Sequence, residues 1–171
     1  AVINRTTATD DDEQRAALEA FEKMGIDAKT GYKYLAKLQA AGMLFDDGKT
    51  TEGLAALNAV ANDKAAPEQF RGVATLSAVS FEFNTAPAEK LIARLTPYLV
   101  TGNPFYGSAA ELAAALYLKE NNPESAAALL RQAVTDPALP QQMAERLNGY
   151  LSMIDATTSE NASIESGETI K

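Results

Sequence analysis

Proline recurs along this chain at a nearly constant interval. Pro67, Pro104 and Pro140 each open a segment with helix-like apolar spacing, at separations of 104 − 67 = 37 and 140 − 104 = 36 residues. A second series, Pro87 and Pro123, lies between them, with 123 − 87 = 36. Because proline is tolerated in the first turn of a helix but not in its interior, each proline marks a helix start. Two interleaved series with one period predict a two-helix unit that is repeated along the chain.

Two stretches of the sequence are nearly the same, NDKAAPEQF at 62–70 and TDPALPQQM at 135–143. Aspartate, alanine, proline and glutamine recur in them at an offset of 136 − 63 = 73 residues, which is two periods of the proline series. The turns DDG at 46–48 and ENN at 120–122 also lie at equivalent places, and each can supply the left-handed residue that ends a helix. Thr30 is the expected N-cap of the helix that precedes the first of these turns.

The fold class follows from the spacing of apolar residues within each segment. They recur at intervals of three and four, and no run alternates with period two, so the sequence predicts an all-α fold without strands. Alanine, the best helix former, dominates the 46% hydrophobic share, and aromatic residues make up only 7%. The expected architecture is a right-handed helical solenoid of about three helix pairs, in which each pair packs on the next.

The ends of the chain are expected to differ from its middle. Residues 12–24 are in phase with the second helices of the pairs, so we expect an unpaired N-terminal helix whose mate precedes the given sequence. Residues 1–11 are expected to be a flexible segment, and 156–171 a disordered polar tail that buries too little apolar surface to become ordered. The repeat domain is therefore predicted to span 12–155.

Composition excludes several kinds of site. The chain has no cysteine and no histidine, which excludes disulfides, thiol nucleophiles and the usual zinc ligand sets. A formal charge of −8 disfavours binding to nucleic acid. The acidic run at 10–13 precedes a predicted helix, where negative charge is favourable, and Asp46 and Asp47 lie in a turn. We therefore predict no catalytic residue, metal site or cofactor. A lyase or hydrolase that uses these carboxylates would need a deep pocket with two facing buried acids.

One short segment has the features of a docking strip for an acidic partner. Lys29, Lys33 and Lys37 recur every four residues along one helix face, with Tyr32 and Tyr34 nearby. The alternative is an ordinary solvated helix face.

Phe105 and Tyr106 follow Pro104 at a helix start and have two interpretations. Either they anchor a partner peptide at the surface, or they fill the space between adjacent hairpins.

The period and the two helices per unit resemble tetratricopeptide repeats. The proline and the small residue of the second helix (Ala55, Ala128) match that consensus, but the tryptophan and glycine–tyrosine signature of the first helix does not. Generic alanine-rich helical hairpins are the alternative.

A narrower resemblance lies in LTPYLVTGNPFYGSAAELAAAL at 95–116 and DPALPQQM at 136–143. Together with the surrounding helices, roughly residues 14–154, these stretches are similar to the periplasmic tetratricopeptide-like domain of alphaproteobacterial inner-membrane proteins related to the ancillary subunit of the SecYEG translocon. The resemblance implies a membrane anchor upstream of this sequence, a periplasmic location, and partners among translocon subunits and periplasmic chaperones. It implies a non-enzymatic scaffold. The alternative is a cytoplasmic adaptor that homodimerises through an end hairpin.

Overall fold

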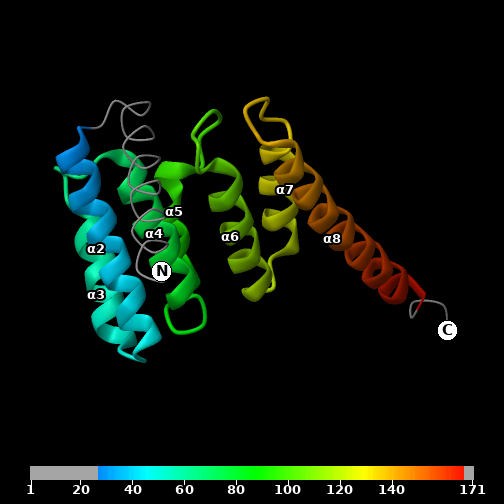
Figure 1. The fold of residues 1–171 in the computed structure, drawn as a ribbon. Helices are drawn as coiled ribbons and strands as arrows, with labels where there is room; N and C mark the ends of the chain where they lie inside the picture. Colours follow the sequence, from blue (N-terminus) through cyan, green and yellow to red (C-terminus); the bar gives the residue numbers. More distant parts are fainter. Residues whose placement is uncertain (1–26, 168–171) are drawn as a thin grey trace, which may run out of the picture. The chain divides into compact units, whose positions relative to one another are not determined.

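The computed structural model describes the backbone of residues 27–167 and the side chains of residues 27 and 29–160. The segments expected at 1–11 and 12–24 lie outside these residues. The helices are α2 (Ala28–Asp46), α3 (Thr50–Ala61), α4 (Glu68–Glu82), α5 (Ala88–Leu95), the short 3₁₀ helix η1 (Thr96–Tyr98), α6 (Tyr106–Lys119), α7 (Pro123–Ala133) and α8 (Gln141–Gly167) (Figure 1). The part of the chain that the structure describes contains no strand, which confirms the all-α prediction.

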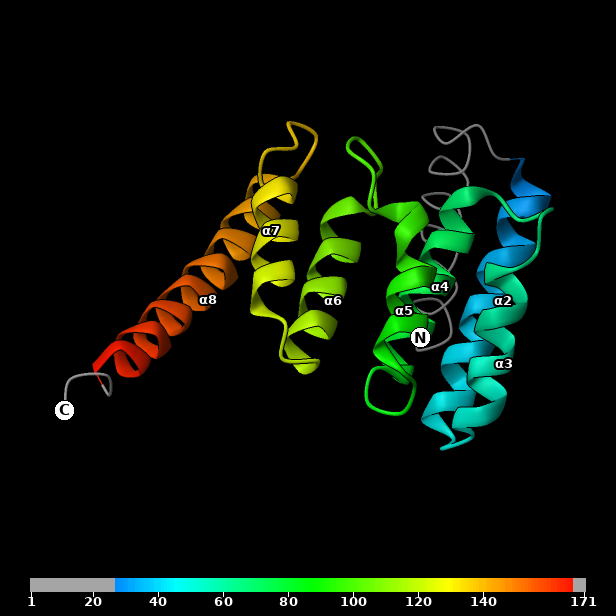
Figure 2. The same cartoon turned by 180° about the vertical axis from the view of Figure 1, so that it is seen from behind.

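The chain forms two compact units, Ala1–Ala74 and Thr75–Lys171, and their boundary falls inside α4. In the first unit α2 and α3 pack side by side, joined by a tight turn (Figure 1). In the second unit α6 packs against α5, α7 against α6, and α8 against α7. Helix α8 begins beside α7 and continues beyond it (Figure 2). The candidate site lies in this second unit.

The prolines lie at helix starts, as the sequence predicts. Pro67 immediately precedes α4, and its carbonyl accepts the N–H groups of the first turn. Pro140 precedes α8 in the same way, Pro87 is the N-cap of α5, and Pro123 is the first residue of α7. Pro104 lies slightly earlier, in the turn before α6.

The start of α2 differs from the prediction. The N-cap is Asp27, whose carboxylate accepts the N–H of Thr30 at 3.0 Å, so the expected cap at Thr30 is wrong. Both residue types are good caps, and the aspartate satisfies the free N–H three residues downstream of it. Thr30 therefore lies inside the helix.

The turns after α2 and α6 have the same geometry 121 − 48 = 73 residues apart. Gly48 and Asn121 both have positive φ, 75° and 56°, which confirms the predicted left-handed residues. The backbone hydrogen bonds run from Gly48 to Phe45 (2.9 Å) and Lys49 to Leu44 (2.8 Å) in the first turn, and from Asn121 to Leu118 and Asn122 to Tyr117 (both 2.9 Å) in the second. Such paired bonds satisfy carbonyls that a helix end leaves free.

Helix α8 continues past residue 155, where the sequence places the start of a disordered tail. The hydroxyls of Thr157, Thr158 and Ser159 each donate to the carbonyl four residues earlier, at 2.8–2.9 Å. Such hydroxyls can compete with the helix for backbone hydrogen bonds, and here they are bonded within the helix itself. Because extending an established helix is far easier than starting one, the packed part of α8 supports this extension.

Candidate functional site

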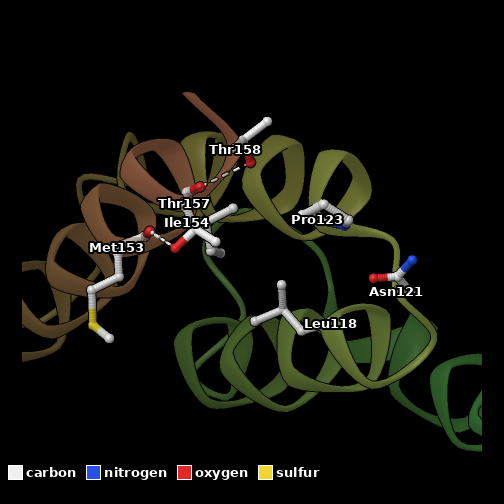
Figure 3. A pocket seen from close by; sticks show the side chains of 7 residues that line it. All are labelled: Leu118, Asn121, Pro123, Met153, Ile154, Thr157 and Thr158. Carbon is white, nitrogen blue, oxygen red and sulfur yellow. Dashed lines mark hydrogen bonds between the residues drawn. The ribbon is translucent and has the colours of Figure 1, made fainter. Parts of the chain in front are cut away.

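Two adjoining hollows lie between α6 and α8 in the second unit, with volumes of about 440 Å³ and about 300 Å³. They share Leu118, Met153 and Ile154, and we call them together the α6–α8 groove. The larger hollow is also lined by Glu111, Leu112, Ala114, Ala115, Leu130 and Tyr150. The smaller is also lined by Asn121, Pro123, Thr157 and Thr158 (Figure 3).

At one end of the groove, α6 and α8 approach each other closely. A Cβ atom on Gly107, near the start of α6, would lie 2.5 Å from Leu139 Cδ1 and 2.8 Å from Met143 Cγ. One turn further along, Arg146 of α8 donates to Glu111 of α6 at 2.8 Å. Beyond that ion pair the hollows begin. The missing side chain at Gly107 therefore sets the close end of the groove.

Large apolar side chains of the groove are exposed. The exposed fractions are 43% for Leu118, 41% for Tyr150 and 68% for Met153. Alanines of α6 line the space beside them, and their small side chains leave it unfilled. Contiguous exposed apolar surface with a polar rim is typical of interaction sites rather than of inert surface.

The groove presents few polar groups. Glu111 is its only charged lining residue among those described, and it is already paired with Arg146. The hydroxyls of Thr157 and Thr158 are bonded to carbonyls of their own helix. Within residues 27–160, no group of three or more acidic side chains is arranged to hold a metal ion.

The predicted lysine strip lies on α2, in the first unit. Lys33 and Lys37 both approach the ring of Tyr34, with each ammonium nitrogen 4.9 Å from the ring centre. Lys37 also lies 3.7 Å from Asp63 Oδ2. Lys29 is exposed and Tyr32 is half-buried. The structure thus brings two of the lysines together over a tyrosine, and the docking role of the strip stays a prediction.

Phe105 and Tyr106 are placed as packing residues of the second unit. Tyr106 is 1% exposed and lies in the cluster formed by α6, α7 and α8. Phe105 is half-buried and packs edge-on against Tyr98, with ring centres 5.8 Å apart. Of the two interpretations, filling the interior describes both residues.

Sequence reasoning missed the residues of the groove. Leu118 fits the apolar periodicity of its helix, so the sequence predicts a buried core position. Tyr150 and Met153 have no feature that distinguishes them from other residues of the last helix. Nothing in the spacing shows which apolar positions lack a neighbour, because that depends on the separation of α6 and α8. The signal that could have indicated the groove is the alanine-rich sequence of α6. Small side chains on every face of this helix leave space beside it.

The two repeated aspartates perform the same local task. Oδ1 of Asp63 accepts the N–H of Ala65, and Oδ1 of Asp136 accepts that of Ala138, both at 2.9 Å. The second oxygens have different donors. Asp63 Oδ2 accepts the Tyr34 hydroxyl at 2.8 Å, and Asp136 Oδ2 accepts the N–H of Gly102 at 2.7 Å. Each aspartate thus orders its own turn and ties it to an earlier segment.

Substitutions at Tyr34 and Tyr106 compare a tyrosine hydroxyl that is hydrogen-bonded with one that is not. Tyr106 has a buried hydroxyl with no hydrogen-bond partner among the described residues, and burial, followed by the charge of Asp136, raises its pKa. We expect Tyr106→Phe to leave the free energy of unfolding unchanged or to raise it by about 1 kcal/mol, because it removes an unsatisfied group. We expect Tyr34→Phe to lower it by about 1 kcal/mol, because the bond to Asp63 is lost. Denaturant unfolding of both variants measures this, and equal losses would contradict it.

Acid is expected to weaken the first unit through Asp63. The hydrogen bond from Tyr34 lowers the pKa of Asp63 below 3.8, and the N–H of Ala65 and the charges of Lys37 and Lys33 act in the same direction. The folded state therefore favours the ionised carboxylate. Its contribution to stability is complete above the pKa of the unfolded chain and is lost as the pH falls through the lower folded value.

The measurement compares wild type with Asp63→Asn in denaturant titrations from about pH 6 down to about pH 2.5. We expect wild type to be the more stable at the upper end and the difference to shrink as the pH falls. A difference that does not change with pH would contradict the linkage.

Among the described residues, no helix combines the length and the apolar character that are needed to cross a membrane. Comparison of the chain with family models, with curated proteins and with solved structures gave no match.

Proposed function

We propose that this chain is a non-enzymatic protein-binding module whose α6–α8 groove receives an apolar segment of a partner protein. The observation that carries the proposal is the exposure of Leu118, Tyr150 and Met153 along one hollow. Grooves between helices accept the apolar face of a partner helix, and large central side chains supply most of the binding energy. Methionine suits such a surface because its flexible side chain adapts to different partners.

We also propose that the helices form a tetratricopeptide-like solenoid. The matching backbone hydrogen bonds of the turns after α2 and α6, and the matching Oδ1 hydrogen bonds of Asp63 and Asp136, support a pattern repeated at an interval of 73 residues. Solenoids present extended surfaces to other proteins, and their stability comes from contacts between neighbouring units. The groove would then be the part of that surface that lies between successive first helices.

The cellular setting is proposed from the resemblance of 95–116 and 136–143 to the Sec-associated periplasmic family. On this proposal the chain is the periplasmic domain of a protein anchored in the inner membrane, and it serves translocon subunits or periplasmic chaperones without a cofactor. The alternative is a cytoplasmic adaptor that homodimerises through an end hairpin. The natural N-terminus discriminates between them, because only the first setting requires an apolar span upstream.

Site-specific photocross-linking in host cells tests the proposal on the full-length protein. A photoreactive amino acid at Met153 lies in the groove, and one at Met43, on α2, is the matched control, since both side chains are 68% exposed. We expect protein adducts from Met153 and few from Met43, with a translocon subunit or periplasmic chaperone among the former. Equal adducts from both sites would contradict the groove, and adducts with a second copy alone would favour the adaptor.

A further inference from the structure

Three glutamates lie within three residues of the lining residues at the end of the groove where α6 turns into α7. Glu120 precedes the lining residue Asn121, and Glu124 follows the lining residue Pro123. Glu160 lies one helical turn beyond Thr157 of α8. All three glutamates are exposed, and none forms an ion pair with another described residue.

The basic side chains of this region are already engaged. Arg131 pairs with Asp155 at 2.5 Å, and Arg146 pairs with Glu111 at 2.8 Å. The ammonium group of Lys119 donates to the carbonyl of Phe83 at 2.6 Å. Lys119 keeps its charge in this bond, but the three glutamates outnumber it, so the α6–α7 end of the groove presents net negative charge.

We infer that the occupant of the groove is a segment with large apolar side chains followed at one end by lysine or arginine. This inference rests on the proposed function. The apolar part would lie against Leu118, Tyr150 and Met153, and the basic end would lie beside the three glutamates. Apolar burial gives such a complex its affinity, and charge complementarity gives it orientation and selectivity.

The same charges argue against a second copy of this chain as the occupant. The chain has a formal charge of −8, and residues 75–171 hold 11 acidic against 6 basic side chains, a net charge of −5. Seating one acidic surface on another brings like charges together, which opposes association. A basic-ended segment has the opposite effect at the same positions.

Fluorescence anisotropy with synthetic peptides tests the inference on the whole chain. The first probe is an amphipathic helix-forming peptide of leucine, methionine and alanine that ends in lysines. The second has glutamates in place of the lysines, and the third keeps the lysines but has serines in place of the large apolar residues. The protein variants are the combined Glu120→Gln, Glu124→Gln and Glu160→Gln change, and the single changes Met153→Glu and Met43→Glu.

We expect the lysine-ended peptide to bind about tenfold more tightly than the glutamate-ended one at low salt, a preference that three exposed ion pairs can supply. This preference should disappear in the triple glutamine variant and weaken at about 0.5 M salt. Met153→Glu should weaken binding of both apolar peptides, whereas Met43→Glu should not. The serine peptide should bind much more weakly than either.

The outcomes separate the inference from the proposed function. If both apolar peptides bind equally and Met153→Glu weakens both, the inference of a basic end is overturned while the groove remains a binding site. If the serine peptide binds as tightly as the lysine-ended peptide, charge alone drives binding and the inference is overturned. If no peptide binds, or Met153→Glu has no effect, both are overturned. Self-association of wild type that Met153→Glu abolishes would identify a second copy as the occupant and overturn the inference.

Discussion

Replacing Leu147 with alanine is expected to lower the free energy of unfolding of the second unit by about 2–5 kcal/mol. Leu147 has no exposed surface and lies in the cluster that joins α8 to α6 and α7. The substitution removes buried apolar contacts and leaves a cavity that the surrounding helices fill only in part. Hydrogen–deuterium exchange resolved to α6, α7 and α8 measures the loss locally, because amides of a loosened cluster exchange faster.

The matched control for this prediction is Leu118→Ala. Leu118 is 43% exposed at the groove, so the same substitution there is expected to change stability by less than about 1 kcal/mol. Equal losses of stability at the two positions would show that packing in this cluster does not hold α8 against α6 and α7. The arrangement of α6 and α8 that forms the groove would then be contradicted.

Replacing Gly107 with alanine is expected to destabilise the second unit by about 1–3 kcal/mol. The new methyl group would lie 2.5 Å from Leu139 Cδ1 and 2.8 Å from Met143 Cγ, closer than atoms in proteins approach. Both side chains must then leave their packed positions beside α6. Denaturant unfolding measures the loss.

Gly149→Ala is the control, and it is expected to change stability in the opposite direction. Gly149 lies inside α8, and a Cβ atom there would meet nothing within 4 Å. Alanine is the better helix former by about 1 kcal/mol, so this variant is expected to be more stable than wild type. If both glycine variants were stabilised, the close approach of α6 and α8 at Gly107 would be contradicted.

Much of the fold could be predicted from sequence because its signals are local. Proline at 67, 87, 123 and 140 marks helix starts through the chemistry of its own ring, and Gly48 and Asn121 end helices through their own φ angles. The cap of α2 shows the limit of such reasoning. Asp27 and Thr30 are both good caps, and the choice between them depends on which backbone N–H remains unpaired.

The candidate site could not be predicted in the same way, because it depends on helices that are distant in sequence. Whether Met153 is buried or exposed is decided by the distance between α6 and α8, and Gly107 and Met143 set that distance. Tyr106 is a residue whose burial, rather than exposure, depends on such packing. Its position beside Phe105 suits a surface anchor, yet packing by α7 and α8 buries it completely.

The most direct test of the account is a methyl NMR titration of the full chain, labelled at its methionines, with the lysine-ended peptide. Met153 in the groove and Met43 on α2 are equally exposed, at 68% each, so they differ in location and not in access to solvent. If the groove is the binding site, the Met153 methyl resonance shifts on addition of the peptide and that of Met43 does not. An unchanged Met153 resonance, or a larger shift at Met43, would contradict the assignment of the α6–α8 groove as the protein-binding surface.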